Sequence, residues 1–406
     1  MAALASPRSA ELPSTRHRLP ARLRLLIAAR AVNQLGAFSL AFLTVLLNRD
    51  LGASLPTAGA ISGLFGLATI PSRLLGGRLT DRWGRRRTIV VGLAGCAVAQ
   101  LGIAAAPELA VAAVCCVLLG LAFELYEPPS QAMIADGVAP ADRASAFALL
   151  STALAVGNMG AGLVADLVGR SSLRRLFVVD AASCLACALI VRLALPDDRA
   201  RSDPELGPSP HAAAPAPSPW QDRRLLTMTA AGTVFALISM LMLVALPLSL
   251  GADGLDPAAA GLLMTASTVT LLIARPALRI RRLAELTPGA AFAAGYLLMA
   301  AGLAGYAVAH TLPTLLGPTA LYALGNLLLM GRSFAVVSDL APPAGSARYL
   351  AVYGLSWGFA TVLAPPLSTS LLDAFPPAAL WTAMAAICLA MAATQPWLLR
   401  RLPRST

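Results

Sequence analysis

Long apolar stretches alternate with short polar breaks along nearly the whole chain. A helix that crosses a bilayer needs roughly 20 mostly apolar residues, and twelve stretches approach or reach that length. They fall at about 24–48, 57–76, 88–106, 109–134, 146–168, 174–195, 225–250, 257–278, 288–309, 313–338, 349–372 and 377–399. Each is a continuous apolar run, whereas membrane-spanning strands alternate apolar and polar residues. The pattern therefore predicts an all-α membrane protein with twelve transmembrane helices.

One long polar stretch interrupts this pattern. Residues 196–222 are rich in Pro, Ala and charge, a composition that cannot form a packed core and predicts a flexible linker. The linker divides the chain into two halves of six predicted helices each. The predicted parts are a polar tail (1–23), a first bundle (24–195), the linker, a second bundle (223–400) and a short tail (401–406).

The two halves also resemble each other in sequence. The segment Ser130-Gln-Ala-Met-Ile-Ala-Asp136 recurs half a chain later as Ser333-Phe-Ala-Val-Val-Ser-Asp339. Repeats of this kind are a recurrent design in transporters, whose substrate site lies at the repeat interface near the bilayer midplane. We therefore expect two pseudo-symmetric bundles; chance similarity between helices rich in small residues is the alternative.

Composition and charge placement agree with a membrane protein. The chain is 57% hydrophobic and 13% charged, whereas soluble domains carry about 25% charged residues. All 31 basic residues are arginines: 23 lie in tails and loops on the side of the N-terminus, four on the opposite side and four within helices. This bias predicts a plasma-membrane protein with both termini in the cytoplasm, and it accounts for the net charge of +11 without nucleic acid. The sequence does not explain the external cluster of Arg170, Arg174 and Arg175.

The sequence shows no chemistry of an enzyme or a metal site. It contains no P-loop, no Ser/His/Asp arrangement and no set of metal ligands. Cys184 and Cys187 have the spacing of a metal or redox pair, but they lie in an apolar run without a second ligand pair or basic neighbours. We therefore expect neither catalytic activity nor a cofactor, and we interpret the six cysteines as small buried side chains.

The loop between the second and third predicted helices carries the most specific motif. Residues 77–89 read Gly-Arg-Leu-Thr-Asp-Arg-Trp-Gly-Arg-Arg-Arg-Thr-Ile, and six of these side chains are ionic. The spaced residues are Gly77, Asp81, Arg82, Gly84, Arg85 and Arg86. The glycines allow the backbone to turn, and the arginines around Asp81 favour an ionised, paired carboxylate. A plain positive-inside loop needs arginines but not this spacing.

This spacing resembles the loop between helices 2 and 3 of the major facilitator superfamily of transporters. The resemblance implies the major facilitator fold, in which two six-helix bundles enclose a cavity lined by helices 1, 4, 7 and 10. Residues 128–136 and 348–357 resemble helix 4 and the start of helix 11 in the drug/proton antiporter branch. The same resemblance implies that Arg85 pairs with Asp136 and that Asp81 faces the start of helix 11. The fifth helix departs from the branch, because its pattern lacks a Pro and has Asp166 in place of a Gly.

The first predicted helix carries a stripe of polar and small residues at steps of three and four, which share one face. The stripe consists of Arg30, Asn33, Gln34, Ala37, Ala41, Thr44 and Asn48. A packed face of small residues is the alternative, but it leaves Arg30 unexplained, because a charge at the bilayer centre costs roughly 2.5–3.5 kcal/mol. We expect the stripe to line the cavity, with Arg30, Asn33 and Gln34 as substrate contacts.

Two acids mark the fourth predicted helix. Glu124 and Glu127 lie three residues apart and therefore on one helix face, which the superfamily fold turns toward the cavity and Arg30. Like charge and desolvation favour the protonated form of one of the two. Both are therefore candidates for proton coupling; a permanent ion pair is the alternative. The next candidates are Asp166 and Asp180.

Other features of the cavity helices follow from the sequence. Pro128 and Pro129 predict a kink in the fourth helix. On the tenth helix, Asn326 and Arg332 are candidate substrate contacts, although Arg332 could instead extend toward a lipid headgroup. Trp357 on the eleventh helix is either a stacking surface for substrate or lipid-facing bulk.

Together these features predict a secondary active transporter that works by alternating access, with proton-coupled export of small amphipathic molecules or drugs as the first hypothesis. We expect a monomer whose partners are the small-molecule substrate, protons and the lipid bilayer. Proton-coupled uptake of a small metabolite is the alternative, although the aromatic content of 5% counts against a sugar. A non-transporting membrane receptor is a third alternative, against which the charges in the cavity argue.

Overall fold

The computed structural model describes residues 20–138, 143–195, 219–276, 286–341 and 346–400. These residues form helices joined by short turns, and no strand occurs among them. The first half contains α1 (Ala21–Gln34), η1 (Ala37–Phe42), α2 (Leu43–Arg49), α3 (Leu55–Trp83), α4 (Arg85–Ala105), α5 (Leu109–Phe123), α6 (Glu127–Asp136), α7 (Arg143–Gly169) and α8 (Leu173–Ala194). The second half contains η4 (Pro219–Gln221), α9 (Arg223–Ala252), η5 (Pro257–Ala259), α10 (Ala260–Ala274), α12 (Pro288–Val308), α13 (Leu312–Leu340), α14 (Ser346–Ala374) and α15 (Pro377–Arg400).

Parts of the predicted tails and linker fall outside the described residues. These parts are 1–19, 196–218 and 401–406, so the predictions of a flexible linker and two tails stay predictions. After η4, α9 begins with a local signal that is visible in the sequence. The Asp222 carboxylate accepts a hydrogen bond from the backbone N–H of Arg224 at 2.9 Å, as an N-cap residue does.

Ten helical segments of the described residues are long and apolar enough to cross a membrane. They correspond to ten of the twelve predicted stretches. The remaining two are the first, which α1, η1 and α2 form together, and the second, which is α3. For these two stretches the prediction of a spanning helix therefore rests on the sequence pattern alone.

The prediction of one continuous first helix is wrong. The α-helix stops at Gln34, continues as the 3-10 helix η1 from Ala37, and becomes α-helical again at Leu43. Gly36 lies at the interruption and packs directly on α8. A Cβ atom at Gly36 would come within 2.5 Å of the Asp180 Cα. Because the helix axis is interrupted there, the predicted polar stripe does not form a single face.

The fourth stretch is interrupted as well, in the turn directly before the two prolines for which the sequence predicted a kink. Helix α5 stops at Phe123 and α6 starts at Glu127, so Pro128 and Pro129 lie in the first turn of α6. Proline is tolerated there because the first backbone N–H groups of a helix have no partner within it. The prolines therefore follow the break and start a new helix.

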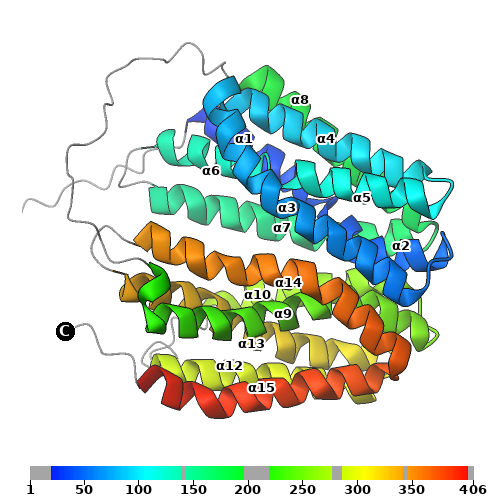
Figure 1. Cartoon of the computed structure of the whole chain (residues 1–406), viewed down its shortest axis with the longest axis vertical. Coiled ribbons are helices and arrows are strands. Elements are labelled where there is room, and N and C mark those ends of the chain that lie inside the picture. Colours follow the sequence, from blue (N-terminus) through cyan, green and yellow to red (C-terminus); the bar gives the residue numbers. More distant parts are fainter. Residues whose placement is uncertain (1–19, 139–142, 196–218, 277–285, 342–345, 401–406) are drawn as a thin grey trace, which may run out of the picture.

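The helices of the two halves form two bundles that meet along one boundary (Figure 1). The strongest contacts across this boundary join α3 to α14 and α7 to α10. The repeated sequence segments occupy equivalent places, since one lies in α6 and the other in the last turns of α13, at the end of the fourth stretch of each half. The fold is thus all-α with two pseudo-symmetric bundles, as the sequence predicted.

Glycines allow close contact across the boundary at the end of the bundles away from Gly84. A Cβ atom at Gly59 of α3 would lie 2.8 Å from the Pro365 carbonyl oxygen of α14. On α7, a Cβ atom at Gly162 would collide with Thr265 of α10. Thr265 also donates a hydrogen bond to the Met159 carbonyl at 3.1 Å. The two halves are therefore closed together at this end.

Candidate functional site

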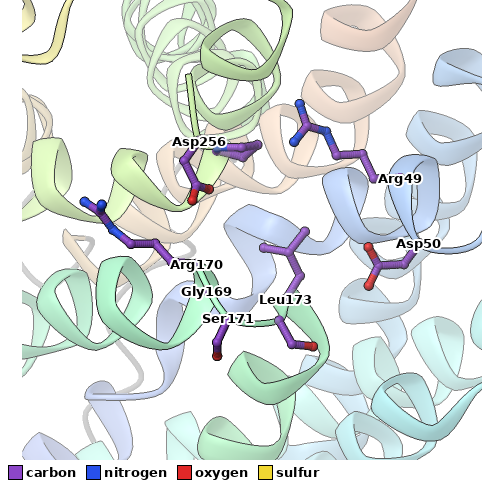
Figure 2. A pocket seen from close by; sticks show the side chains of 9 residues that line it. Arg49, Asp50, Gly169, Arg170, Ser171, Leu173 and Asp256 are labelled. Carbon is purple, nitrogen blue, oxygen red and sulfur yellow. The ribbon is translucent and has the colours of Figure 1, made fainter. Parts of the chain in front are cut away.

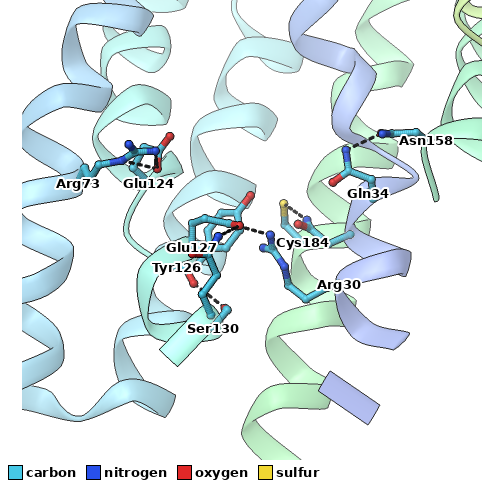
Figure 3. Close-up of polar contacts among 11 residues, drawn as sticks. Arg30, Gln34, Arg73, Glu124, Tyr126, Glu127, Ser130, Asn158 and Cys184 are labelled. Carbon is cyan, nitrogen blue, oxygen red and sulfur yellow. Dashed lines mark hydrogen bonds and ion pairs between the residues drawn. The ribbon is translucent and has the colours of Figure 1, made fainter. Parts of the chain in front are cut away.

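An ion pair joins the first and fourth helical stretches. The Arg30 guanidinium of α1 donates a hydrogen bond to the Glu127 carboxylate of α6 (Figure 3). The Cζ atom of Arg30 also lies 4.8 Å from the centroid of the Tyr126 ring. The Arg30 side chain is 6% exposed and that of Glu127 is 30% exposed. One member of the pair is thus buried, and the carboxylate of the other remains partly exposed.

The interruption between α5 and α6 positions this pair. Glu127 is the first residue of α6, where the helix dipole favours a negative charge. The backbone of the interruption packs against two glycines of neighbouring helices. A Cβ atom at Gly76 of α3 would lie 3.3 Å from the Leu125 Cα, and one at Gly92 of α4 would lie 3.2 Å from the Tyr126 backbone nitrogen. Helices α3 and α4 therefore pack against the backbone directly before Glu127 and fix the position of this acid.

Glu124 lies apart from this pair, contrary to the prediction that both acids share one face. It ends α5, and its carboxylate accepts hydrogen bonds from Arg73 of α3 at 3.1 and 3.2 Å (Figure 3). The side chain of Arg73 is 63% exposed and that of Glu124 is 18% exposed. Each acid thus has its own arginine. Arg73 was not among the predicted site residues, although an arginine within a predicted span is a visible signal in the sequence.

The other polar residues of the first helix contact protein neighbours. Asn33 donates to the Cys184 sulfur of α8 at 3.2 Å, and Gln34 donates to the Asn158 side-chain oxygen of α7 at 2.6 Å (Figure 3). Beyond the interruption, the hydroxyls of Thr44 and Ser62 lie 2.9 Å apart. Asn33 and Gln34 therefore attach α1 to its own bundle, and their role as substrate contacts stays a prediction.

The arginine-rich loop is shorter than predicted, because α3 and α4 are separated by Gly84 alone. Gly84 has φ of 85°, a conformation that glycine adopts at little cost. Arg86 donates to the carbonyl of Leu195, the residue that ends α8, at 2.8 Å. The side chains of Asp81 and Asp136 lie outside what the structure describes, so their predicted contacts stay predictions.

The candidates in the second half lie on α13 and α14. Asn326 and Arg332 are half-buried on α13. Trp357 of α14 is half-buried and packs edge-on against Phe235 of α9, with ring centroids 6.0 Å apart. Trp357 therefore packs within the second bundle, and its predicted role as a stacking surface for substrate stays a prediction.

The end of the bundles away from Gly84 contains the arginines that the sequence predicted to be external. Arg170 donates to both carboxylate oxygens of Asp166, at 2.8 and 3.0 Å, and these hydrogen bonds raise the pKa of the guanidinium. Arg174 donates to the carbonyls of Ala104 and Ala106 at 3.0 and 2.8 Å, at the end of α4. The cluster therefore neutralises an acid and satisfies carbonyl groups at the end of a helix, which have no partner within it.

Both halves line a pocket of about 440 Å³ at this end (Figure 2). Arg49, Asp50 and Arg170 come from the first half, and Asp256 comes from the second. The Arg174 guanidinium lies 3.8 Å from the Asp50 carboxylate. Asp166 is thus part of a charged region at the closed end of the bundles. It lies further along α7 than Asn158, which contacts Gln34, and it is not part of the site that contains Glu127.

The profile of the Major Facilitator Superfamily matches residues 26–248 and 228–406. The chain belongs to the major facilitator superfamily. It is similar to an uncharacterized MFS-type transporter, YhjO of Bacillus subtilis (strain 168), with 26% identity over 396 residues that cover 92% of each chain. A shorter match of 148 residues, 30% identical, joins it to the multidrug resistance protein MdtH of Cronobacter sakazakii (strain ATCC BAA-894) and covers 36% of this chain and 37% of that protein.

Solved structures of the superfamily share its fold. A mutant of the nucleoside transporter NupG superposes with a TM-score of 0.78 over 93% of this chain and 99% of the other, at 14% identity. At that identity the likeness concerns the fold. The superfamily member described here is therefore a multi-pass membrane transporter whose Arg30–Glu127 pair lies between the first and fourth helical stretches.

Proposed function

We propose that the protein exports small amphipathic molecules or drugs in exchange for protons, by alternating access. The observation that carries this proposal is the Arg30–Glu127 ion pair. It joins two interrupted helical stretches, and its acid is partly open while its base is buried. A protonatable acid paired with a buried cation is the element that a proton can use to change the balance between two conformations.

Protonation of Glu127 removes the charge that compensates Arg30. A buried charge that loses its partner destabilises the surrounding structure by about 3–5 kcal/mol. A difference of about 5.5 kcal/mol reverses a 1:99 population, so this pair supplies a large part of what a full switch requires. Because Gly76 and Gly92 pack on the interruption beside Glu127, movement of the pair reaches α3, α4 and the arginine-rich loop.

The other candidates take secondary roles in this proposal. Glu124, already paired with exposed Arg73, tunes the charge near Glu127. Asp166 stabilises the closed outer end through Arg170. In this proposal the substrate contacts come from the second bundle and from Arg30 of the Arg30–Glu127 pair. They are Asn326, Arg332 and Trp357, with Arg30.

Several features support export and orientation. The helix-4 segment 128–136 resembles drug/proton antiporters, and the relative MdtH is named a multidrug resistance protein. The arginine bias supports a plasma-membrane location with the termini, the arginine-rich loop and the linker in the cytoplasm. We assign Arg85–Asp136 and the approach of Asp81 to α14 to the outward-open state, in a protein that works as a monomer.

A proton-flux assay tests the function. Inside-out vesicles with an acid interior receive lipophilic cations, drugs, sugars or carboxylates, and fluorescence follows the proton gradient. We expect drug-like compounds to dissipate the gradient, with protein-free vesicles as the control. A gradient that becomes steeper when a sugar or carboxylate is added would favour the uptake alternative, because a symporter carries protons into the vesicle together with the added substrate. If no compound changes it, with folded protein present, proton-coupled export is wrong.

A further inference from the structure

The pocket at the end of the bundles away from Gly84 is lined by charged side chains of both signs. Arg49, Asp50 and Arg170 come from the first half, and Asp256 comes from the second (Figure 2). All four residues are exposed, and the volume of about 440 Å³ is enough for a small organic molecule. Because the two arginines and the two acids balance in formal charge, the lining as a whole favours neither a simple anion nor a simple cation.

Arg49 places an unpaired cation on one side of this pocket. It ends α2, and its guanidinium extends to α9 of the other half, where a Cβ atom at Gly251 would collide with it. Arg49 forms no hydrogen bond or ion pair with any residue that the structure describes. The carboxylate of the neighbouring Asp50 lies 3.8 Å from the guanidinium of Arg174 instead. The donors of Arg49 are therefore free to bind a carboxylate or a phosphate, which a guanidinium holds through two parallel hydrogen bonds.

Asp256 provides a negative charge on the other side of the pocket, near Arg170 (Figure 2). Its Oδ1 atom accepts a hydrogen bond from the backbone N–H of Ala258 at 2.9 Å, and its Oδ2 atom has no partner among the described residues. Arg170 donates to both carboxylate oxygens of Asp166, so another acid already compensates this arginine. Asp256 thus keeps an oxygen and a negative charge to which an ammonium group can donate.

We propose that this pocket binds a small zwitterion, with its anionic group on Arg49 and its ammonium group on Asp256. A zwitterion gives each of these opposite charges a partner, whereas a simple ion would pair with one of them and leave the other unchanged. The chemistry fits a free amino acid or the headgroup of a lipid such as phosphatidylethanolamine. Since Arg49 and Asp256 belong to different halves, the bound zwitterion stabilises the conformation in which this end is closed.

Thermal unfolding of the full chain in nanodiscs of phosphatidylglycerol, a lipid without a zwitterionic headgroup, tests this site. The probes are glycine, β-alanine and γ-aminobutyrate, which differ in the distance between their charges. Acetate and ethylammonium, compared at equal ionic strength, each carry one of the two groups. A ligand that binds the folded state raises Tm with the logarithm of its concentration above Kd, whereas an excluded osmolyte acts on every variant alike. We expect at least one amino acid, and neither simple ion, to raise the wild-type Tm in this way.

Variants assign the response to the two charges. Arg49→Gln and Asp256→Asn should each increase the concentration needed for the same rise about tenfold, because each removes one charged partner. Asparagine is still an N-cap residue, so Asp256→Asn keeps the hydrogen bond to Ala258. Arg49→Lys keeps the charge and should bind more strongly than Arg49→Gln. Asp253→Asn is the matched control, because Asp253 is an exposed acid three residues away that does not line the pocket.

The outcomes also separate the two sources of the zwitterion. An amino-acid response that requires both Arg49 and Asp256 identifies a soluble ligand. If phosphatidylethanolamine nanodiscs raise the Tm of the wild type but of neither variant, the ligand is the lipid headgroup. The inference is overturned if neither source raises the wild-type Tm, if acetate or ethylammonium gives the same rise, or if the response is unchanged in either variant. The measurement involves no transport, so its result does not depend on proton-coupled export.

Discussion

The end of the bundles away from Gly84, which our proposal places outside and which is called the outer end below, depends for its closure on the absence of a side chain at Gly162. A Cβ atom there would collide with the Thr265 hydroxyl and the Gly261 carbonyl of α10, and would lie 3.0 Å from the Thr265 nitrogen. Two of these three atoms are backbone, so the partner helix cannot adjust by a change of rotamer. Gly162→Ala should therefore disfavour the closed outer end by about 1–3 kcal/mol, the cost of overpacking. That difference corresponds to about a 5- to 150-fold shift in population.

Distance measurement between spin labels reports this shift. One label at Ser171→Cys and one at Ala252→Cys lie at exposed positions on the two halves, in a background whose six native cysteines are replaced by alanine. We expect Gly162→Ala to lengthen the distance distribution. Gly317→Ala is the matched control, because a Cβ atom at Gly317 would have no atom within 4 Å. If Gly162→Ala gives the same distribution as Gly317→Ala, the contact does not hold the outer end closed.

Three further changes test other parts of the structure. Gly92→Leu should reduce transport: a Cβ atom at Gly92 would already lie 3.0 Å from the Leu125 side chain, so a larger side chain should displace the interruption beside Glu127, at a strain cost of about 1–3 kcal/mol. Gly358→Leu is the control, because Gly358 has open space around it and its variant should transport as the wild type does. Unchanged transport in Gly92→Leu would contradict this prediction. Arg174→Ala should lower Tm, because it removes two hydrogen bonds from a cation to the end of α4, worth about 1.5–3 kcal/mol in total at this partly exposed site; an unaltered Tm would show that the cluster has no structural role. Arg73→Ala should change the free energy of unfolding by less than about 1 kcal/mol, because the Arg73 side chain that pairs with Glu124 is exposed to solvent. A large loss of Tm would show that this ion pair contributes more than an exposed pair does.

The sequence predicted the architecture well because hydrophobic periodicity determines which segments cross a bilayer. The spacing of 77–89 indicated the superfamily, and the fold that this resemblance implies suggested a pair between Arg30 and one of the two acids of the fourth helix. The choice of Glu127 over Glu124 was not predictable, because it depends on where the fourth helix breaks. A sequence pattern treats both acids as one helical face, whereas the break gives each its own arginine.

The interruption of the first helix was equally hidden. Periodicity assumes a straight helix, so Asn33 and Gln34 fell on the same face as Arg30. In the structure Gly36 packs on Asp180, and the two amides turn to α8 and α7. Gln100 of α4, which donates a hydrogen bond to the buried carboxylate of Asp180, likewise carried no pattern in the sequence, because Asp180 lies 80 residues further along the chain. Contacts between helices, which sequence periods do not encode, decided each of these points.

The central claim is that Glu127 couples protons to transport through Arg30. The most direct test compares two activities of the wild type and Glu127→Gln in proteoliposomes: uphill transport driven by a proton gradient, and exchange of substrate without a gradient. Gln keeps the shape and can still accept a hydrogen bond from Arg30, but it cannot release a proton. The account predicts that Glu127→Gln loses uphill transport and retains exchange. Uphill transport at the wild-type rate in Glu127→Gln would contradict the account.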